Sequence, residues 1–260
     1  MVSYHVARYG QPKLPAILFL HGFMGSSNDW WPLLAELATY FHCICVDLPG
    51  HGQTVTPDYD IPNTAHSLVK LLESLAVDRP SYLFGYSLGG RLALYMALHY
   101  PQYWQKVVLE SASAGLATLA AQQERQKQDQ AIARKLRQPH LDFAEFVDHW
   151  YQQPVFQGMN TQPHFPALIV QRLQNQPVAL ARSLENAGLG SQPYLGQLLA
   201  RNQIPLLLMV GENDHKLMAI NQAMAASCPA AELLIVPGCS HNIHWQQPQQ
   251  WSQTLQAWFS

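Results

Sequence analysis

The segment Gly85-Tyr86-Ser87-Leu88-Gly89 has residue types and spacing suited to nucleophilic or base chemistry. It follows a short apolar run, 81–84, and precedes a helical pattern, 88–99. This G-x-S-x-G pattern fits a sharp strand-to-helix turn, where the flanking glycines relieve crowding around a strained serine. The pattern also arises by chance, so the prediction depends on partner residues elsewhere in the chain. If they are present, Ser87 is predicted to act as a nucleophile or a base.

An acid and a histidine follow the serine in the order that such folds use. Asp214 comes just after the apolar run 206–210, and His241 comes just after the run 233–236. Because the carboxyl ends of parallel strands gather catalytic groups, these side chains are expected near Ser87. Asp214 would orient His241, which would take the proton of Ser87. Glu212, two residues nearer its strand, is the competing acid.

Two backbone N–H groups are predicted to form an oxyanion hole beside Ser87. One belongs to Leu88, which follows the serine, and the other to Phe23, in the loop after the apolar run 16–20. Gly22 before it lets the backbone approach closely. Each preorganised donor of this kind is worth on the order of 3 kcal/mol toward a developing oxyanion.

The other histidines have simpler interpretations. His21 and His51 lie in turn-like glycine-containing loops and are predicted to support the structure rather than act as bases. His241 and His244 are three residues apart, which could suit a metal, but no matched third ligand or H-E-x-x-H motif accompanies them. We therefore expect no metal and no organic cofactor.

Three arginines point to an anionic substrate. Arg91 lies one helical turn after Ser87, Arg125 shares a helix face with apolar residues, and Arg172 follows the apolar run 168–170. Guanidinium groups bind carboxylates with two parallel hydrogen bonds. The alternatives are a structural ion pair for Arg91 and a weak pair along the helix between Arg125 and Asp129. A substrate with several carboxylates would use all three arginines.

Composition excludes several classes of protein. The chain has 260 residues, is 48% hydrophobic and 12% charged, and has a net charge of −2, so neither a nucleic-acid nor a membrane partner is expected. Its first residues lack a signal-peptide pattern, and no apolar run approaches the ~18 residues that span a bilayer. The four cysteines are expected to be reduced and buried. We expect a monomer that acts in the cytoplasm on a small molecule.

The elements that must position these residues alternate between strand and helix, which is typical of a mostly parallel sheet covered on both faces. Strands are predicted at 16–20, 42–46, 82–84, 107–110, 206–210 and 233–236, with an N-terminal strand around 2–8 antiparallel to 16–20. Helices are predicted around 30–38, 64–75, 88–100 and 249–258. Residues 113–203 lack a convincing strand and are predicted to form a helical cap inserted into a core made of 1–112 and 204–260.

Three motifs together resemble the 2-succinyl-6-hydroxy-2,4-cyclohexadiene-1-carboxylate synthases of menaquinone biosynthesis, over essentially the whole chain. They are Gly85-Tyr86-Ser87-Leu88-Gly89-Gly90-Arg91, Trp150-Tyr151-Gln152-Gln153-Pro154-Val155-Phe156 and Gly211-Glu212-Asn213-Asp214-His215-Lys216. The resemblance implies an α/β-hydrolase fold and a lyase that eliminates pyruvate from a tricarboxylate enolpyruvyl precursor.

The resemblance also implies roles for particular residues. It makes Ser87, Asp214 and His241 a catalytic triad, and it gives Arg91, Arg125 and Arg172 roles in binding carboxylates. Tyr86 and Trp150 would line the pocket. The chain departs from the family pattern at Ala114, where proline is frequent, and at Leu217, where an aromatic residue is frequent. These departures affect the shape of a loop and the packing of the cap.

Two other functions stay open from the sequence. The same triad would serve a carboxylesterase, a thioesterase or a C–C bond hydrolase acting on an acidic substrate. A catalytically inactive hydrolase fold that binds a ligand or a protein is the third reading, and the complete order of serine, acid and histidine disfavours it.

Overall fold

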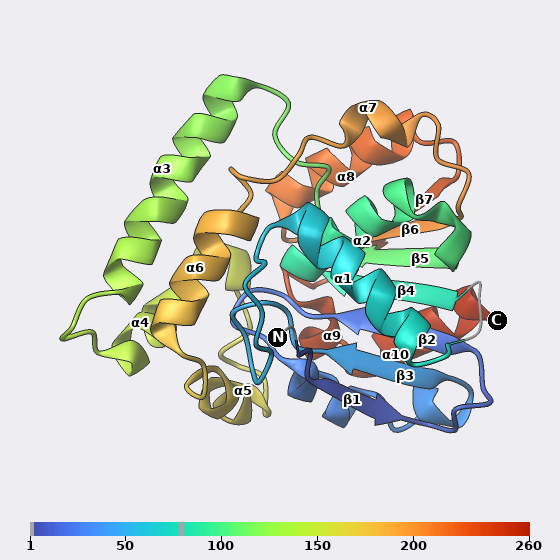
Figure 1. The fold of residues 1–260 in the computed structure, drawn as a ribbon, viewed down its shortest axis with the longest axis horizontal. Coiled ribbons are helices and arrows are strands. Elements are labelled where there is room, and N and C mark those ends of the chain that lie inside the picture. Colours follow the sequence, from blue (N-terminus) through green and yellow to red (C-terminus); the bar gives the residue numbers. More distant parts are fainter. Residues whose placement is uncertain (1–2, 78–80) are drawn as a thin grey trace.

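The computed structural model describes residues 3–77 and 81–260, and within these ranges the strands form a seven-stranded sheet (Figure 1). Their order is β1-β3-β2-β4-β5-β6-β7, with β1 antiparallel to β3 and the other pairs parallel. The strands are β1 (Val6–Tyr9), β2 (Ala16–Leu20), β3 (His42–Val46), β4 (Ser81–Tyr86), β5 (Trp104–Glu110), β6 (Leu206–Gly211) and β7 (Ala231–Val236).

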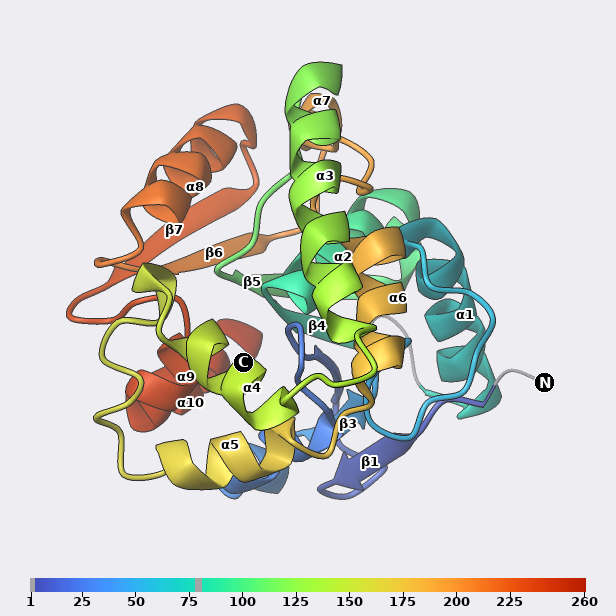
Figure 2. The same ribbon diagram turned by 90° about the vertical axis from the view of Figure 1, so that its left-hand side faces the viewer.

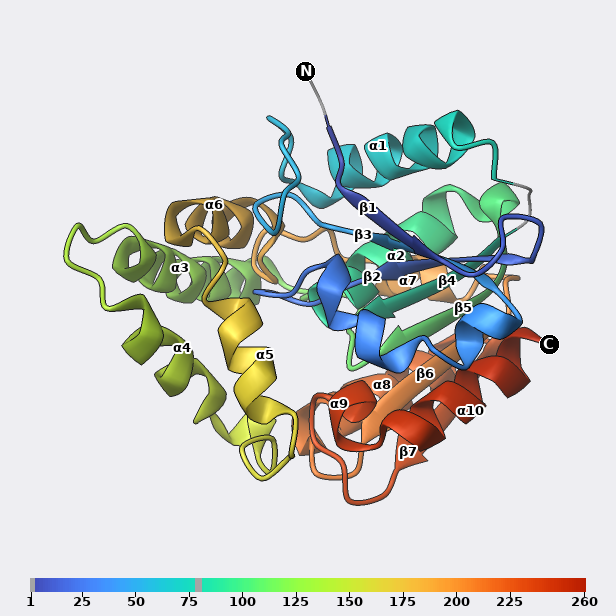
Figure 3. The same cartoon turned by 90° about the horizontal axis from the view of Figure 1, so that it is seen from below.

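Helices cover both faces of the sheet, with α1 and α2 on one side and α9 and α10 on the other (Figure 3). The α-helices are α1 (Ile61–Ser74), α2 (Leu88–His99), α3 (Leu119–Leu136), α4 (Phe143–Tyr151), α5 (Phe165–Arg172), α6 (Pro177–Ala187), α7 (Gly196–Leu199), α8 (His215–Ser227), α9 (Ile243–Gln246) and α10 (Pro248–Phe259). The short 3-10 helices are η1 (Ser27–Asp29), η2 (Trp31–Leu33), η3 (Leu37–Thr39), η4 (Pro101–Tyr103) and η5 (Pro154–Phe156).

Strand β2 is apolar at every position because both of its faces are buried. In β2, Leu18 and Leu20 pack into the core on one face of the sheet, whereas Ile17 and Phe19 pack into the core on the other. Successive side chains of a strand point to opposite faces, so a strand between two helical layers needs apolar residues at every position. This is why β2 could be predicted from an unbroken apolar run, and β3 from a run that is apolar after its first residue, His42.

All six predicted parallel strands are present; β2 and β3 have the predicted bounds and the other four are longer. The predicted pairing of the N-terminal strand was wrong. Strand β1 pairs antiparallel with β3, not with β2. The reason is that β2 lies between β3 and β4, so both of its edges are already hydrogen-bonded, whereas β3 offers a free edge. The start of that predicted strand, at Val2, lies outside the described residues.

The predicted helix over 30–38 was also wrong, although its buried face was correct. Trp30, Leu34 and Leu37 are buried, but the chain forms the separate turns η1, η2 and η3 instead of one α-helix. Pro32 has no N–H with which to continue the helical hydrogen bonds from η1, so the chain turns again at η2 instead of extending one helix. Helix α8 was not predicted, because its sequence shows little contrast between a polar and an apolar face.

Between β5 and β6 the chain leaves the sheet and forms helices α3 to α7. Helices α3, α4, α5 and α6 lie together beyond the carboxyl ends of the parallel strands, whereas α7 lies near α8 (Figures 1 and 2). Helices α3 and α6 pack along each other, and a separate hydrophobic cluster joins this layer to Met24 and Trp245 of the core. The part of the chain described contains no helix long and apolar enough to cross a membrane. The carboxyl edge of the sheet, where the catalytic residues are predicted, faces the helical layer of α3 to α6.

Candidate active site

Ser87 occupies a strained turn between β4 and α2. Its φ of 51° and ψ of −107° lie in a region that residues with a side chain rarely adopt. A Cβ added to Gly85 would overlap the backbone of Gly89, and one added to Gly89 would overlap the backbone of Leu20. The two glycines of the motif are thus required by close backbone contacts. The turn presents Ser87 at the carboxyl edge of the sheet.

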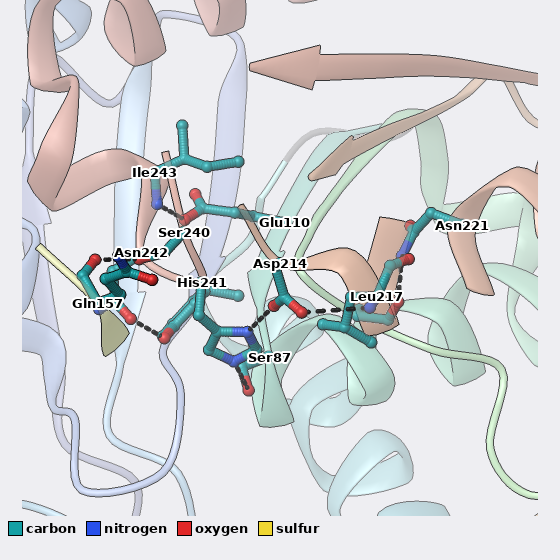
Figure 4. A network of polar contacts seen from close by, with 12 residues as sticks. Ser87, Glu110, Gln157, Asp214, Leu217, Asn221, Ser240, His241, Asn242 and Ile243 are labelled. Carbon is teal, nitrogen blue, oxygen red and sulfur yellow. Dashed lines mark hydrogen bonds and ion pairs between the residues drawn. The ribbon is translucent and has the colours of Figure 1, made fainter. Parts of the chain in front are cut away.

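Ser87, His241 and Asp214 form a continuous hydrogen-bonded chain (Figure 4). His241 Nε2 lies 3.0 Å from Ser87 Oγ, and His241 Nδ1 lies 2.7 Å from Asp214 Oδ2. The other carboxylate oxygen of Asp214 accepts a hydrogen bond from Leu217 N, at the start of α8. This contact holds the buried carboxylate in place. The arrangement allows His241 to withdraw a proton from Ser87 while Asp214 stabilises the charged ring.

The competing acid predicted from the sequence is directed elsewhere. Glu212 Oε2 accepts a hydrogen bond from Gly238 N at 3.0 Å, and the side chain is exposed. Asp214, not Glu212, contacts the histidine.

The loop after β2 lies directly against the serine. Gly89 N donates to His21 O at 3.1 Å, and a Cβ on Gly22 would lie 3.5 Å from Ser87 Cβ. His21 holds the loop through its ring, since Nε2 accepts from Leu48 N and Nδ1 bonds Gly22 O. Burial lowers the pKa of His21, in keeping with the neutral ring that this pattern needs. Phe23, in this loop, and Leu88, which follows the serine, both line the cavity, and their N–H groups stay the predicted oxyanion donors.

Ser87 lines a cavity of about 660 Å³. Residues of both the core and the helical layer form its walls. Tyr86 and Trp150 line it, as do Phe23 and Leu88. The centroid of the Tyr86 ring lies 5.4 Å from the centroid of the His241 ring, and the Tyr86 hydroxyl donates to Asn242 Oδ1. The centroid of the Trp150 ring lies 5.2 Å from the centroid of the Phe23 ring.

Arg91, Arg125 and Arg172 all line this same cavity. Arg91 Nη1 donates to Ala187 O and to Gln192 Oε1, each at 3.0 Å. Both acceptors are neutral, and the carboxylate that offsets the positive charge of Arg91, that of Asp129, acts without a hydrogen bond to it. Burial, with a smaller effect from the charge of Arg125, lowers the pKa of Arg91 to about 10, and the side chain stays cationic at neutral pH.

The other two arginines have carboxylate partners. Arg125 Nε bonds Asp129 Oδ1 at 2.8 Å, the pairing along the helix that the sequence left open, and its side chain is 34% exposed. Arg172 is buried and donates both Nη groups to Asp29, with Nε bonding Tyr151 Oη. Burial is the largest single influence and lowers the pKa of Arg172, but the charges and hydrogen bonds of Asp29 and Tyr151 together outweigh it and raise the pKa above its ordinary value. The three arginines thus line one cavity, and neighbouring carboxylates offset their positive charges to different extents.

Several residues at the site were not predicted from the sequence. Asp29 neutralises Arg172, Gln192 holds Arg91, and Lys216 lines the cavity. Glu110 bonds the segment after His241. A sequence signal existed for Glu110 alone, because a carboxylate that ends an apolar strand must find donors at the sheet edge.

His241 and His244 bind different carboxylates. His241 bonds Asp214, whereas His244 Nδ1 bonds Glu110 Oε1 at 2.6 Å. Within residues 3–77 and 81–260, no group of three or more His, Cys, Asp or Glu side chains is arranged to hold a metal ion. The spacing of these two histidines is therefore explained by two separate acid–histidine pairs.

Comparisons with known proteins agree with this architecture. The model of the alpha/beta hydrolase fold family matches residues 15–248. The chain is 34% identical over 259 residues to the 2-succinyl-6-hydroxy-2,4-cyclohexadiene-1-carboxylate synthase of Serratia proteamaculans, covering 98% of this chain and 97% of that protein. It is 35% identical over 249 residues to the synthase of the same name from Escherichia coli, covering 95% of each.

A solved structure described as MenH from S. aureus superposes with a TM-score of 0.90 at 29% identity, covering 99% of this chain and 98% of that one. The agreement extends through the helical layer as well as the sheet. The chain belongs to the 2-succinyl-6-hydroxy-2,4-cyclohexadiene-1-carboxylate synthase family, within the alpha/beta hydrolases.

Proposed function

We propose that this protein is a lyase of menaquinone biosynthesis. It converts 2-succinyl-5-enolpyruvyl-6-hydroxy-3-cyclohexene-1-carboxylate into 2-succinyl-6-hydroxy-2,4-cyclohexadiene-1-carboxylate and pyruvate. The single observation that carries the proposal is the hydrogen-bonded series Ser87–His241–Asp214 at the base of a cavity that three arginines line. Membership of the synthase family supports the same reaction.

The reaction is an elimination that begins with loss of a ring proton. His241 takes the hydroxyl proton of Ser87, and Ser87 Oγ removes the proton from the ring carbon that bears the succinyl group. The electron pair moves toward the succinyl carbonyl oxygen, where the N–H groups of Phe23 and Leu88 would stabilise it. The electrons then return through the ring double bond and break the bond to the enolpyruvyl oxygen. The leaving enolate takes a proton and becomes pyruvate.

The substrate carries three carboxylates, which matches the cationic lining of the cavity. Arg91 has only neutral hydrogen-bond partners and is the best placed to bind a carboxylate directly. Arg125 uses only Nε for Asp129, and two N–H groups of Arg172 remain after its bonds to Asp29 and Tyr151. Tyr86 and Trp150 would pack against the ring and the succinyl chain. Binding by several fixed charges orients the ring proton toward Ser87.

Acyl hydrolysis by the same triad is the competing activity. To decide between them, the purified protein is given the enolpyruvyl substrate and, separately, a neutral nitrophenyl ester. We expect pyruvate and the diene in equal amounts, at a rate far above that of ester cleavage. Faster ester cleavage that is indifferent to Arg91→Ala would instead identify a carboxylesterase.

The elimination needs no metal and no organic cofactor, since the proton and the leaving group are both handled by the residues above. That the protein is a monomer of the cytoplasm without a nucleic-acid or membrane partner stays a prediction from composition.

A further inference from the structure

Glu110 connects the two halves of the catalytic machinery. Its main-chain oxygen, at the end of β5, accepts a hydrogen bond from Ser87 N at 2.9 Å. Its side chain reaches the segment that follows His241, where Oε1 accepts from Ile243 N at 2.8 Å and from His244 N at 3.3 Å. Figure 4 shows this carboxylate beside Ile243, above the triad in that view. One residue therefore holds both the serine and the histidine segment.

The hydrogen bonds to this side chain all converge on a single oxygen. His244 Nδ1 is the third donor to Oε1, at 2.6 Å, whereas Oε2 accepts no hydrogen bond from the described residues. The Glu110 side chain is completely buried, and His244 is 1% exposed. The segment thus depends on where this one oxygen lies. A neutral amide oxygen at the same place could accept the same three hydrogen bonds.

A small displacement of this segment would move the catalytic histidine. His241 Nε2 lies 3.0 Å from Ser87 Oγ, a distance at which proton transfer is sensitive to small shifts. His241 is two residues from Ile243, and its own N–H is held from the other side by Val155 O. We infer that Glu110 is a positioning residue that sets the distance between His241 and Ser87 through its Oε1 atom. The inference rests on the proposed catalytic role of the triad.

The test compares two conservative variants that separate reach from charge. Glu110→Gln keeps the length of the side chain and an oxygen acceptor, whereas Glu110→Asp keeps the charge but is one methylene shorter. Two rates are measured for each purified variant: release of pyruvate, and labelling of Ser87 by a fluorophosphonate. We expect Glu110→Gln to keep at least half of the wild-type kcat. Glu110→Asp should lose on the order of 10- to 100-fold in kcat and in labelling rate, with KM within about twofold of wild type.

Other outcomes would overturn the positioning role. If Glu110→Gln is slow and Glu110→Asp is fast, the charge of the side chain matters and its length does not. Equal rates in both variants, whether high or low, would also contradict it, as would a rise in KM in place of a fall in kcat. Labelling does not depend on the natural substrate. If the wild type releases no pyruvate but Glu110→Asp still labels slowly, the proposed function fails and this inference stands.

Asp47 provides a matched control for loss of a buried carboxylate. It is 2% exposed and accepts hydrogen bonds from Ser27 N at 2.6 Å and Gln53 N at 2.8 Å, away from His241. The melting temperature of each variant is measured alongside. Asp47→Asn should label Ser87 within about twofold of the wild-type rate even where it melts earlier. If it labels as slowly as Glu110→Asp, the loss is a general loosening of the fold and the positioning role is refuted.

Discussion

Arg172 and Asp29 form a buried ion pair with two hydrogen bonds that joins the helical layer to the segment after β2. The two N···O distances are 2.6 and 2.8 Å, and each side chain is 3% exposed. Asp29 belongs to the segment after β2 that also carries Phe23, the predicted oxyanion donor. Nearby, Asn175 Nδ2 donates to Met24 O in the same segment. The pair therefore fixes the helical layer against the loop that faces the serine.

Removing one partner of this pair should destabilise the fold strongly. Asp29→Leu leaves the Arg172 charge buried without a counterion, and we expect it to lower the free energy of unfolding by about 3–5 kcal/mol. In the double variant Asp29→Leu/Arg172→Met no buried charge remains unpaired, so most of this stability should return. Urea unfolding monitored by tryptophan fluorescence measures both. A double variant that is less stable than either single one would contradict this account.

Arg91 should contribute to substrate affinity because both of its hydrogen-bonded partners are neutral. A hydrogen bond to a charged group is worth about 1.5–3 kcal/mol, so Arg91→Ala should raise KM for the enolpyruvyl substrate by roughly 10- to 100-fold. Arg137, which bonds Glu185 on the surface, is the control, and Arg137→Ala should leave KM unchanged. Steady-state kinetics of pyruvate release measure both variants. An Arg91→Ala variant with the wild-type KM would remove Arg91 from the binding site.

The two acids near β6 should differ sharply in their effect on the rate. Asp214 contacts His241, whereas Glu212 bonds Gly238 at the surface. Asp214→Asn should therefore lower kcat by roughly 10²–10⁴-fold, and Glu212→Gln should lower it less than twofold. The comparison is made at saturating substrate and constant pH. The reverse order of effects would transfer the role of the acid to Glu212.

Two buried histidines should make the fold sensitive to mild acid. Burial is the main cause that lowers the pKa of His51 far below its ordinary value, and it also lowers the pKa of His21. Below the unfolded pKa of about 6.5, the unfolded chain binds protons that the folded one does not, so stability falls as the pH falls. Each group contributes at most about 1.4 kcal/mol per pH unit.

The measurement is the free energy of unfolding from urea titrations between pH 7 and pH 5, using wild type and His51→Gln. We expect the wild type to lose stability throughout this range. The variant should lose it less steeply, by up to about 1.4 kcal/mol per pH unit, because one of the two groups is gone. Identical slopes in the two proteins would show that His51 is not the group that takes up the proton on unfolding.

The structural features that could be predicted from the sequence are those set by residues only a few positions apart. The strands β2 and β3 and the turn at Ser87 could be predicted because apolar runs and flanking glycines lie within a few residues of each other. The order of Asp214 and His241 was predictable because each directly follows a strand. All three residues of the predicted triad lie in one hydrogen-bonded series.

Contacts between distant residues were not predictable in the same way. Arg172 and Asp29 are 143 residues apart, and Ile243 is 133 residues from Glu110. No spacing rule links such positions, because the folded path of the helical layer decides which side chains meet. Arg172 could be predicted to face the cavity, but not to arrive there already paired with an acid.

In the proposed elimination Ser87 is the base, so a variant without its hydroxyl should lose most of the activity. Purified Ser87→Ala protein, with a melting temperature equal to that of the wild type, is mixed with the enolpyruvyl substrate, and pyruvate is followed over time. We expect the variant to release pyruvate roughly 10²–10⁴-fold more slowly than the wild type, with KM little changed. Undiminished release of pyruvate by Ser87→Ala would contradict it.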